Sequence, residues 1–381
     1  MFERVVTSGA RIAAIVVVLL AWHAGAHAQP RPWRPIPRFE CRCTAEAATA
    51  ELERAIANRK PPEPGGAWAM LKDGEPLATR YTGVERIGGA AIGPDTRFYI
   101  GSLAKTITAT AALMLRERGA LKLEDPLTRW VDDVPAFARD IKVIHLLQHT
   151  SGLPDIFAAL GDTVSGLDNA RVLAFVRGLD SLAFAPGERY AYSNTGYVLL
   201  AEVIGRASGR GFGAFVEDSI LKPLGMNATT LVRKGAPPIP HRAIGFRKAS
   251  GSFVPDDLRD HWSLGSGGMY STLGDVITWY RAVVTSRLLR PASTALLFDP
   301  PVTTSGRKSY LGMGWNDETM GSRTPDVDGL RAFGSFGSLA GFRSAVMFYP
   351  DHGLAWIALT NTGEGELPPE GMPVRLFRKL P

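Results

Sequence analysis

A hydroxyl and an amine stand three residues apart in the segment Ser102-Leu103-Ala104-Lys105. On a helix this spacing puts both groups on one face, a turn apart. A serine needs a base to become a nucleophile, and a lysine in a partly dry site can be neutral enough to serve. The positive potential of a helix N-terminus further favours the alkoxide. The pair therefore predicts nucleophilic catalysis.

The S-x-x-K pattern alone is weak evidence, because it recurs at residues 219–222 and 305–308. The first copy differs in the residues after its lysine. Residues 106–113 (TITATAAL) form a run too apolar for the exposed face of a helix, and a charge that enters such a core needs a reason. The structural alternative is that Ser102 caps the helix while Lys105 extends outward into solvent.

Tyr192-Ser193-Asn194 is the second candidate, and the only Y-x-N in a chain with nine tyrosines. A phenol near a lysine can relay a proton, because we expect the neighbouring cation to lower the pKa of the phenol. The asparagine amide offers a donor and an acceptor, which suits it to hold the lysine and to orient a substrate amide. The alternative is a turn before a helix over 196–205, with Asn194 as its cap.

The combination resembles the serine β-lactamase and penicillin-binding protein superfamily, in its class C β-lactamase-like branch. The resemblance covers residues 68–362. Further matches occur in order at 97–101 (RFYIG), 123–127 (LEDPL), 145–153 (HLLQHTSGL), 186–187 (PG), 221–226 (LKPLGM), 267–272 (GGMYST) and 341–342 (GF). So many ordered matches are hard to produce by chance.

The resemblance implies a role for each motif residue. Ser102 would be the acylated nucleophile, Lys105 its proton acceptor, and Tyr192 the acid and base that serves the leaving group. Asn194 would orient Lys105 and the substrate. The backbone N–H groups of Ser102 and Ser338 would form the oxyanion hole, which needs no particular side chain. The family implies neither a metal nor an organic cofactor.

The chain departs from the family at its third motif, which is Lys or His, then any residue, then Gly. Here the triplet is Ser335-Phe336-Gly337, so the glycine is kept and the cation is absent. The cation normally attracts a substrate carboxylate, whereas a neutral serine cannot neutralise charge. We therefore expect esters and neutral amides to be better substrates than penicillins or D-Ala-D-Ala peptides. Arg343 is a poor substitute, because we expect its side chain to point along a strand and away from the cleft.

Other motif candidates are interpreted as structural. The segment His149-Thr150-Ser151-Gly152 resembles a turn that supports the helical part of the family's fold. The glycines at 265–268 lack the spacings of a phosphate-binding loop. The sequence contains no H-E-x-x-H and no G-x-S-x-G, which argues against a zincin and an α/β-hydrolase. The two cysteines, Cys41 and Cys43, are too few for a four-ligand zinc site or a disulfide framework.

The elements that would position these residues come from both ends of the chain. Near the N-terminus we expect a helix at 44–58 and a hairpin of 67–72 and 76–81 around Asp73-Gly74. Helical periodicity dominates from 105–118 to about residue 280. Strand-like runs return at 311–315, 330–333, 342–349 and 354–361. This predicts an α/β (α+β) fold of the β-lactamase/transpeptidase type, with an antiparallel sheet from both chain ends, flanking helices and a mainly helical region at about 120–280.

Composition excludes several classes of protein. With 381 residues, 45% hydrophobic and 21% charged, the chain is an ordinary globular protein rather than a disordered, collagenous or coiled-coil one. The net charge of +6, from 43 Lys and Arg against 37 Asp and Glu, is spread along the chain. We therefore expect no nucleic-acid partner.

The first 28 residues are typical of a secretory signal peptide. Arg4 and Arg11 precede the apolar run 12–22, and Ala26-His27-Ala28 predicts cleavage before Gln29. A retained membrane anchor is the alternative, but a spanning helix needs about 20 apolar residues, so no stable anchor is expected. Residues 29–43 would then be a Pro/Arg-rich tether, 44–365 the hydrolase domain and 366–381 a C-terminal tail.

Export would bring the chain to the periplasm or the extracellular space, which is oxidising. There Cys41 and Cys43 could pair with each other or with another chain, or remain two incidental thiols.

The sequence as a whole predicts an exported serine hydrolase. It would cleave an ester or amide of a small molecule or peptide through a covalent acyl-serine. The rival is a catalytically silent recognition module that keeps the penicillin-binding shape, and Ser335 is its best support. Intact Ser102, Lys105 and Tyr192 favour the enzyme, since a silent module has no need of all three.

Overall fold

The computed structural model describes residues 39–57, 62–161, 165–257, 260–306, 309, 311–318, 330–363 and 374–379. The expected signal peptide at 1–28 and most of the expected tether lie outside these residues. Within the described ranges, no helix is both long and apolar enough to span a bilayer.

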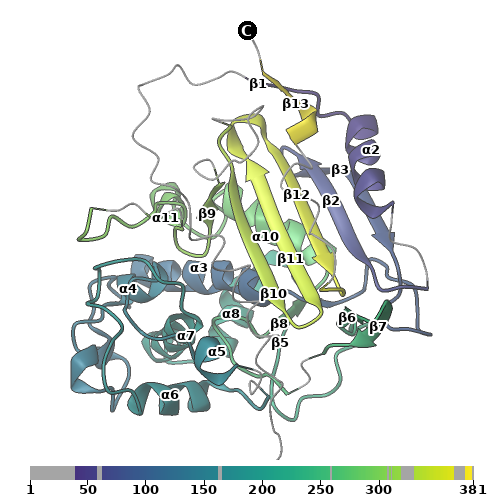
Figure 1. Ribbon diagram of the computed structural model, residues 1–381. Helices are drawn as coiled ribbons and strands as arrows, with labels where there is room; N and C mark the ends of the chain where they lie inside the picture. Colours follow the sequence, from purple (N-terminus) through teal and green to yellow (C-terminus); the bar gives the residue numbers. More distant parts are fainter. Residues whose placement is uncertain are drawn as a thin grey trace, which may run out of the picture. The chain divides into compact units, whose positions relative to one another are not determined.

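A six-stranded antiparallel sheet joins the two ends of the chain, in the order β3-β2-β12-β11-β10-β9 (Figure 1). Its strands are β2 (Gly66–Lys72), β3 (Glu75–Thr82), β9 (Asn316–Asp317), β10 (Phe333–Leu339), β11 (Phe342–Tyr349) and β12 (Leu354–Thr360). At its centre Ala69 of β2 pairs with Ile357 of β12. The prediction of one sheet built from both chain ends is confirmed.

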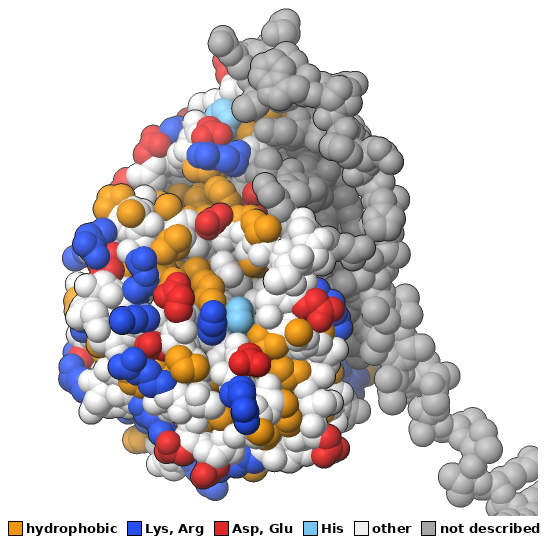
Figure 2. All heavy atoms as spheres, turned by 90° about the vertical axis from the view of Figure 1, so that its left-hand side faces the viewer, with side chains coloured by type: hydrophobic (Ala, Val, Ile, Leu, Met, Phe, Trp, Pro, Cys, Tyr) orange, Lys and Arg blue, Asp and Glu red, His pale blue; other side chains and the backbone are white. Residues whose placement is uncertain are grey.

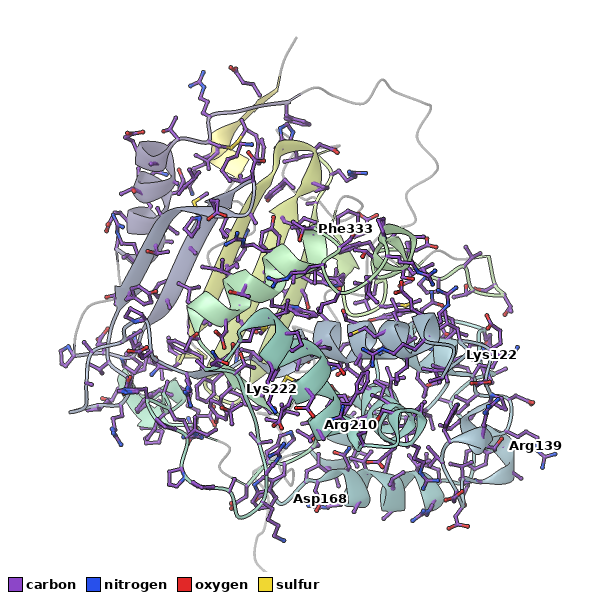
Figure 3. All side chains as sticks on the ribbon, turned by 180° about the vertical axis from the view of Figure 1, so that it is seen from behind. Lys122, Arg139, Asp168, Arg210, Lys222 and Phe333 are labelled. Atoms are coloured by element: carbon purple, nitrogen blue, oxygen red, sulfur yellow. A yellow bond between two sulfur atoms is a disulfide. The ribbon has the colours of Figure 1, made fainter. Side chains whose placement is uncertain are left out.

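Both faces of this sheet are covered, which is why β2 is apolar up to Leu71 and β12 up to Leu359. Trp68 and Trp356 pack on one face in a cluster with α2 (Ala45–Ile56). Ala69 and Ile357 pack on the other face with residues of α3 (Ala104–Glu117) and α10 (Leu273–Val284). Helix α10 can be followed across this second face in Figures 1 and 3.

Helix α3 (Ala104–Glu117) is the buried helix that the sequence predicts, shifted by one residue, and a 3-10 turn at Gly101–Leu103 precedes it. Every residue from Ala104 to Leu115 is buried. Its threonine hydroxyls donate to backbone carbonyls, so their burial leaves no unmet donor. The helix therefore lies in the core, with Ser102 and Lys105 at its N-terminal end.

The helical part packs around α3 and around α7 (Asn194–Ser208), a buried helix with the left-handed Gly209 at its C-terminus. The remaining helices are α4 (Val143–Leu147), α5 (Ile156–Leu160), α6 (Asn169–Arg177), α7 (Asn194–Ser208), α8 (Phe212–Val216), α9 (Lys222–Leu224) and α11 (Pro291–Leu296). Two small sheets accompany them, built from β4 (Phe98–Tyr99), β8 (Met269–Ser271) and β5 (Thr230–Leu231), and from β6 (Phe246–Ala249) and β7 (Ser252–Pro255). The sequence does not indicate these strands, because runs of two to four residues give no measurable periodicity.

The predicted strand at 311–315 is wrong. Leu311 forms only an isolated bridge, and the short strand β9 begins at Asn316. The chain turns at Gly314, whose φ is +81°, and a Cβ there would lie 3.0 Å from the backbone of Lys105. The predicted strand at 330–333 also begins later, because β10 starts at Phe333. Close contact with α3, rather than strand pairing, accounts for the apolar run at 311–315.

The two ends of the described chain pair with each other. Strand β1 (Phe39–Cys41) is antiparallel to β13 (Phe377–Lys379), so both the expected tether and the expected tail contain strand residues. Cys41 and Cys43 form a disulfide with each other. This resolves the alternatives for the two cysteines in favour of an internal pair.

Candidate active site

Three elements bring the predicted residues together at the border between the sheet and the helical part. Ser102 lies in the turn before α3, and Lys105 lies in the first turn of α3. Tyr192 lies in the loop before α7, and Asn194 is the first residue of α7. Strand β10 approaches the same turn from the sheet, since Gly101 and Gly337 are in close contact.

Lys105 is 2% exposed and makes three polar contacts. Its Nζ lies 3.0 Å from Ser102 Oγ, 2.8 Å from Asn194 Oδ1 and 2.7 Å from the carbonyl oxygen of Ser266. The alternative prediction, that Lys105 extends outward into solvent, is therefore wrong.

These contacts determine what a neutral Lys105 can do. A neutral amine has two N–H bonds and one lone pair. The carbonyl oxygens of Asn194 and Ser266 can only accept, so they take the two N–H bonds. The lone pair is left facing Ser102 Oγ, whose O–H can donate to it. The arrangement thus selects one proton donor for the lysine, the hydroxyl of Ser102.

Burial allows the amine of Lys105 to be neutral near pH 7. Removal of water lowers the pKa of Lys105 from its ordinary 10.5 to about 7, against an opposing effect of the Asp155 carboxylate. A base with this pKa is neutral in a large fraction of molecules at pH 7, yet still basic enough to take a proton.

Tyr192 keeps its proton under these conditions. Its hydroxyl lies 2.7 Å from Ser102 Oγ, and 39% of its surface is exposed. Loss of water around the phenol raises its pKa above the ordinary value, which outweighs the lowering effect of the hydrogen bond with Ser102. The expectation that a neighbouring cation lowers this pKa is wrong in direction, because the loss of water around the phenol has the larger effect. Tyr192 is therefore suited to donate a proton.

Asp155 holds Asn194 in its orientation, although no sequence motif points to it. Its Oδ1 accepts from the backbone N–H of Asn194 at 2.9 Å, and its Oδ2 accepts from Asn194 Nδ2 at 3.2 Å. The amide oxygen must then face Lys105. Ser193 is the helix cap, since its hydroxyl accepts from the backbone N–H of Gly196, so the alternative role of Asn194 as the cap is wrong.

The loop 265–268 supplies the third contact of Lys105, and its glycines are required by space. Gly265 has φ +96°, and a Cβ there would lie 2.3 Å from the carbonyl oxygen of Tyr197. Its own carbonyl oxygen accepts from the hydroxyl of Thr108 on α3 at 2.8 Å. A backbone carbonyl has no sequence signature, so the contribution of Ser266 could not be found from the sequence.

Strand β10 presents its open edge to the turn that carries Ser102. Residues of an antiparallel pair alternate between bonded and non-bonded pairs. Only two residues separate Leu339 from Phe342, and the pair that closes such a short hairpin is a bonded one. The next pair, Ser338 with Arg343, is therefore non-bonded, which directs the N–H of Ser338 away from β11. A Cβ on Gly101 would lie 3.0 Å from that nitrogen. The backbone N–H of Ser338 thus lies beside the start of α3.

Ser335 and Gly337 lie on the face of β10 that is turned toward α3. Ser335 pairs in register with Val346, which packs in the cluster of α3, and Gly337 pairs with Ser344. Ser335 is 3% exposed, so its hydroxyl lies inside the molecule. The guanidinium of Arg343 donates to the carbonyl oxygens of Ala340 and Phe342 at the end of the hairpin. Arg343 on β11 therefore does not supply the cation that is missing at Ser335.

The other S-x-x-K copies differ from this site. Lys222 of the second copy is 72% exposed and pairs with Asp218 at 2.6 Å, and it is labelled in Figure 3. Lys308 of the third copy lies outside the described residues. Of the two S-x-x-K lysines that lie within the described residues, Lys105 and Lys222, only Lys105 is buried.

The described ranges contain no group of three or more His, Cys, Asp or Glu side chains that could hold a metal ion. Two surface hollows lie elsewhere, one lined by Arg139 and Gln148, the other by Glu202 and Trp262. On the face in Figure 2, basic and acidic side chains are interspersed.

Known proteins resemble this chain over most of its length. The family model described as "Beta-lactamase" matches residues 52–377. Penicillin-binding protein 4* of Bacillus subtilis (strain 168) is 32% identical over 71% of this chain and 62% of its own. D-aminopeptidase of Gluconobacter oxydans (strain 621H) is 27% identical over 83% of this chain and 60% of its own. The chain thus spans about three fifths of these relatives' length.

A solved structure extends the comparison to the fold. The penicillin-binding protein of Bacillus halodurans superposes with a TM-score of 0.69 at 26% identity, over 84% of this chain and 95% of its own.

Proposed function

The chain belongs to the beta-lactamase family, and from this premise we propose that it is a serine hydrolase acting through an acyl-enzyme on Ser102. The observation that carries the proposal is the environment of Lys105. Its lone pair faces only Ser102 Oγ, and burial holds its pKa at about 7.

Acylation begins with neutral Lys105. As Ser102 Oγ attacks the substrate carbonyl carbon, its proton passes to Nζ, a C–O bond forms and the carbonyl π electrons move to oxygen. The N–H groups of Ser102 and Ser338 stabilise that oxyanion, and fixed donors of this kind contribute about 3–4 kcal/mol each.

Tyr192 then serves the leaving group. When the tetrahedral intermediate collapses, the bond to the leaving nitrogen or oxygen breaks and that atom takes the phenol proton. The proton held by Lys105 replaces it. The raised pKa of Tyr192 suits this step, because the phenol is protonated when the leaving group needs a proton.

Water completes the cycle from the side that the leaving group has left. Its proton goes to the Tyr192–Lys105 pair as its oxygen attacks the ester carbon. Collapse of the second intermediate breaks the bond to Ser102 Oγ, returns a proton to that oxygen and releases the carboxylic acid.

Ser335 directs the proposal on substrates. A buried, neutral hydroxyl stands where the family has a cation, so esters and neutral amides should bind better than acyl donors with a carboxylate at this point. Two relatives bear names of penicillin-binding and aminopeptidase proteins, and those names bear on this chain only as candidate substrate classes.

Export is part of the proposal. The support is the basic and apolar pattern of residues 1–28, with the Cys41–Cys43 disulfide, which suits an oxidising space.

Intact-mass analysis after incubation with a phosphonyl fluoride tests the nucleophile. We expect the native chain to gain one phosphonyl group, with loss of fluoride, and Ser102→Ala to gain none. Lys105→Ala should react on the order of a hundredfold more slowly, the usual scale for loss of a general base. Ser219→Ala is the matched control, because it removes the serine of another S-x-x-K copy, and it should react like the native chain.

Two outcomes contradict the proposal. Labelling that survives in Ser102→Ala places the nucleophile elsewhere. A folded native chain that takes up no probe supports the silent recognition module instead.

A further inference from the structure

The proton donor of the proposed mechanism has few hydrogen bonds of its own. Tyr192 lies in the loop before α7, outside any helix or strand. Among the described residues, Ser102 is the only hydrogen-bond partner of its hydroxyl. A loop side chain loses rotamer freedom only where neighbours restrain it, and a displacement of about 1 Å can cost on the order of a hundredfold in rate. The position of Tyr192 therefore depends on what packs against it.

His149 contacts three consecutive residues of this loop. Its carbonyl oxygen accepts from the backbone N–H of Ala191 at 2.9 Å. Its Nδ1 accepts from the backbone N–H of Ser193 at 3.0 Å. Its ring stacks on the ring of Tyr192, with centroids 4.6 Å apart and planes 25° apart. One residue thus holds both peptide neighbours of Tyr192 and the phenol ring between them.

His149 is itself held firmly. It is 1% exposed, and Tyr197 of α7 stacks on its ring with centroids 4.9 Å apart. The hydroxyl of Tyr197 donates to the carbonyl oxygen of Leu147 at 2.8 Å, which ties this stack to α4. His149 also has φ +56°, a left-handed conformation that is uncommon for a residue other than glycine. Such conformations persist where the surrounding structure fixes them, and they cluster at functional sites.

The hydrogen bond from Ser193 determines the tautomer of His149. Since Nδ1 accepts, the proton of the neutral ring is on Nε2. That atom is buried and has no hydrogen-bond partner among the described residues, which lowers the stability of the folded protein. Burial, with Lys105 nearby, holds the pKa of His149 well below its ordinary value. The ring therefore stays neutral, and its acceptor toward Ser193 is preserved.

We propose that His149 is a positioning residue that holds the phenol of Tyr192 at Ser102 Oγ. The inference rests on the proposed function, in which Tyr192 gives its proton to the leaving group. If His149 acts in this way, its loss impairs that proton transfer and spares bond breaking that needs none. The effect must then depend on the leaving group.

A pair of substrates with one acyl group and two leaving groups provides the test. A 4-nitrophenyl ester releases a stable anion, whereas an alkyl ester needs a proton on its leaving oxygen. His149→Phe keeps a ring and loses the Nδ1 acceptor, and His149→Asn keeps a short acceptor and loses the ring. In both variants we expect kcat/KM for the alkyl ester to fall at least tenfold more than kcat/KM for the nitrophenyl ester. The change should lie in kcat rather than in KM.

Two further variants calibrate the measurement. Tyr192→Phe removes the donor and should show the same selective loss. His145→Phe changes a half-buried histidine one turn earlier, whose Nδ1 accepts from the backbone N–H of Lys142, and it should leave both rates unchanged.

Each outcome decides the matter. Equal losses on the two esters, or no loss, overturn the role of His149, provided that Tyr192→Phe shows the selective loss. If Tyr192→Phe shows no selectivity, the proposed function itself fails. If circular dichroism shows that both His149 variants are unfolded, His149→Gln repeats the test, and equal losses there also overturn the inference.

Discussion

At the scale of single residues, the charge at position 335 should decide which acyl donors are accepted. A hydroxyl there can share a hydrogen bond with a carboxylate but cannot offset its charge. Ser335 faces α3 from β10, so a longer cationic side chain at this point would extend toward the site.

We expect Ser335→Lys to favour substrates that carry a carboxylate. The gain should be about 1.5–3 kcal/mol, or about 10- to 150-fold in kcat/KM, the range for a hydrogen bond to a charged group. The measurement compares matched esters with and without the carboxylate on both proteins. Ser252→Lys adds the same charge on β7 and should leave the ratio unchanged. An unchanged ratio in Ser335→Lys, or a native protein that already prefers the carboxylate, contradicts the assignment of Ser335.

The sequence predicts which residues form the site better than it predicts their protonation states. Side chains with a motif, such as Ser102, Lys105 and Tyr192, could be found, and the structure places them within hydrogen-bond reach of one another. Asp155 and the carbonyl of Ser266 could not, because a lone carboxylate and a backbone oxygen carry no motif. The predicted direction of the Tyr192 pKa is wrong because the sequence does not show how much water the fold removes from around the phenol.

At the scale of elements, the close approach of β10 to the turn before α3 is what allows a strand to serve the nucleophile. A Cβ on Gly337 would lie 2.1 Å from the carbonyl oxygen of Ile100 and 2.4 Å from Ser344 Oγ. That hydroxyl also donates to the carbonyl of Ile100 at 2.7 Å, which ties β11 to the same turn.

We expect Gly337→Ala to lower kcat/KM by at least a hundredfold. The strand must retreat from Ile100, and Ser338 N–H then leaves the position of the oxyanion, with a loss comparable to removal of one oxyanion donor. Gly334→Ala on the same strand is the matched control and should cost far less, since the nearest atoms to its Cβ would belong to side chains, the ring of Phe336 at 3.0 Å and Glu318 Cγ at 3.5 Å. Thermal unfolding of both variants separates lost activity from lost folding. Full activity in a folded Gly337→Ala would exclude this role for β10.

Elements were predictable in proportion to their length and regularity. The hairpin of β2 and β3 carries a turn signal, and Asp73 and Gly74 both have positive φ. The buried helix α3 and strand β12 are long apolar runs with clear ends. The pairing of β1 with β13 could not be predicted, because three residues at each end carry too little pattern to reveal a partner.

At the scale of the whole molecule, the buried base should cost stability. The unfolded chain holds a proton on Lys105 up to about its ordinary pKa of 10.5, whereas the folded chain releases it at about 7. Between these values the unfolded state binds more protons, so the free energy of unfolding rises with pH in this window. Below pH 7 the lysine is charged in both states, and the folded protein carries the full cost of that buried charge.

We expect Lys105→Met to remove this dependence. The native chain should gain stability relative to Lys105→Met as pH rises from 7 to 9, by up to about 1.4 kcal/mol per unit. Urea unfolding at several pH values measures the difference, in which other titrating groups cancel. Lys222→Met, which removes an exposed lysine, should keep the native slope. Parallel stability curves for the native chain and Lys105→Met would mean that Lys105 is not neutral in the folded protein.

The order of strands in the sheet also governs when a newly made chain can act. Translation delivers Ser102 early, together with β2 and β3, but Ala69 must wait for Ile357 before β2 gains its second neighbour. Pairing between such distant residues is slow, because the chain loses the entropy of closing a long loop before the stabilising contacts form. By the proposed mechanism Ser338 is needed as well, and it too is made late. A nascent chain would therefore carry Ser102 through most of its synthesis without Ser338. The order of the strands along the chain thus delays activity until synthesis is nearly complete.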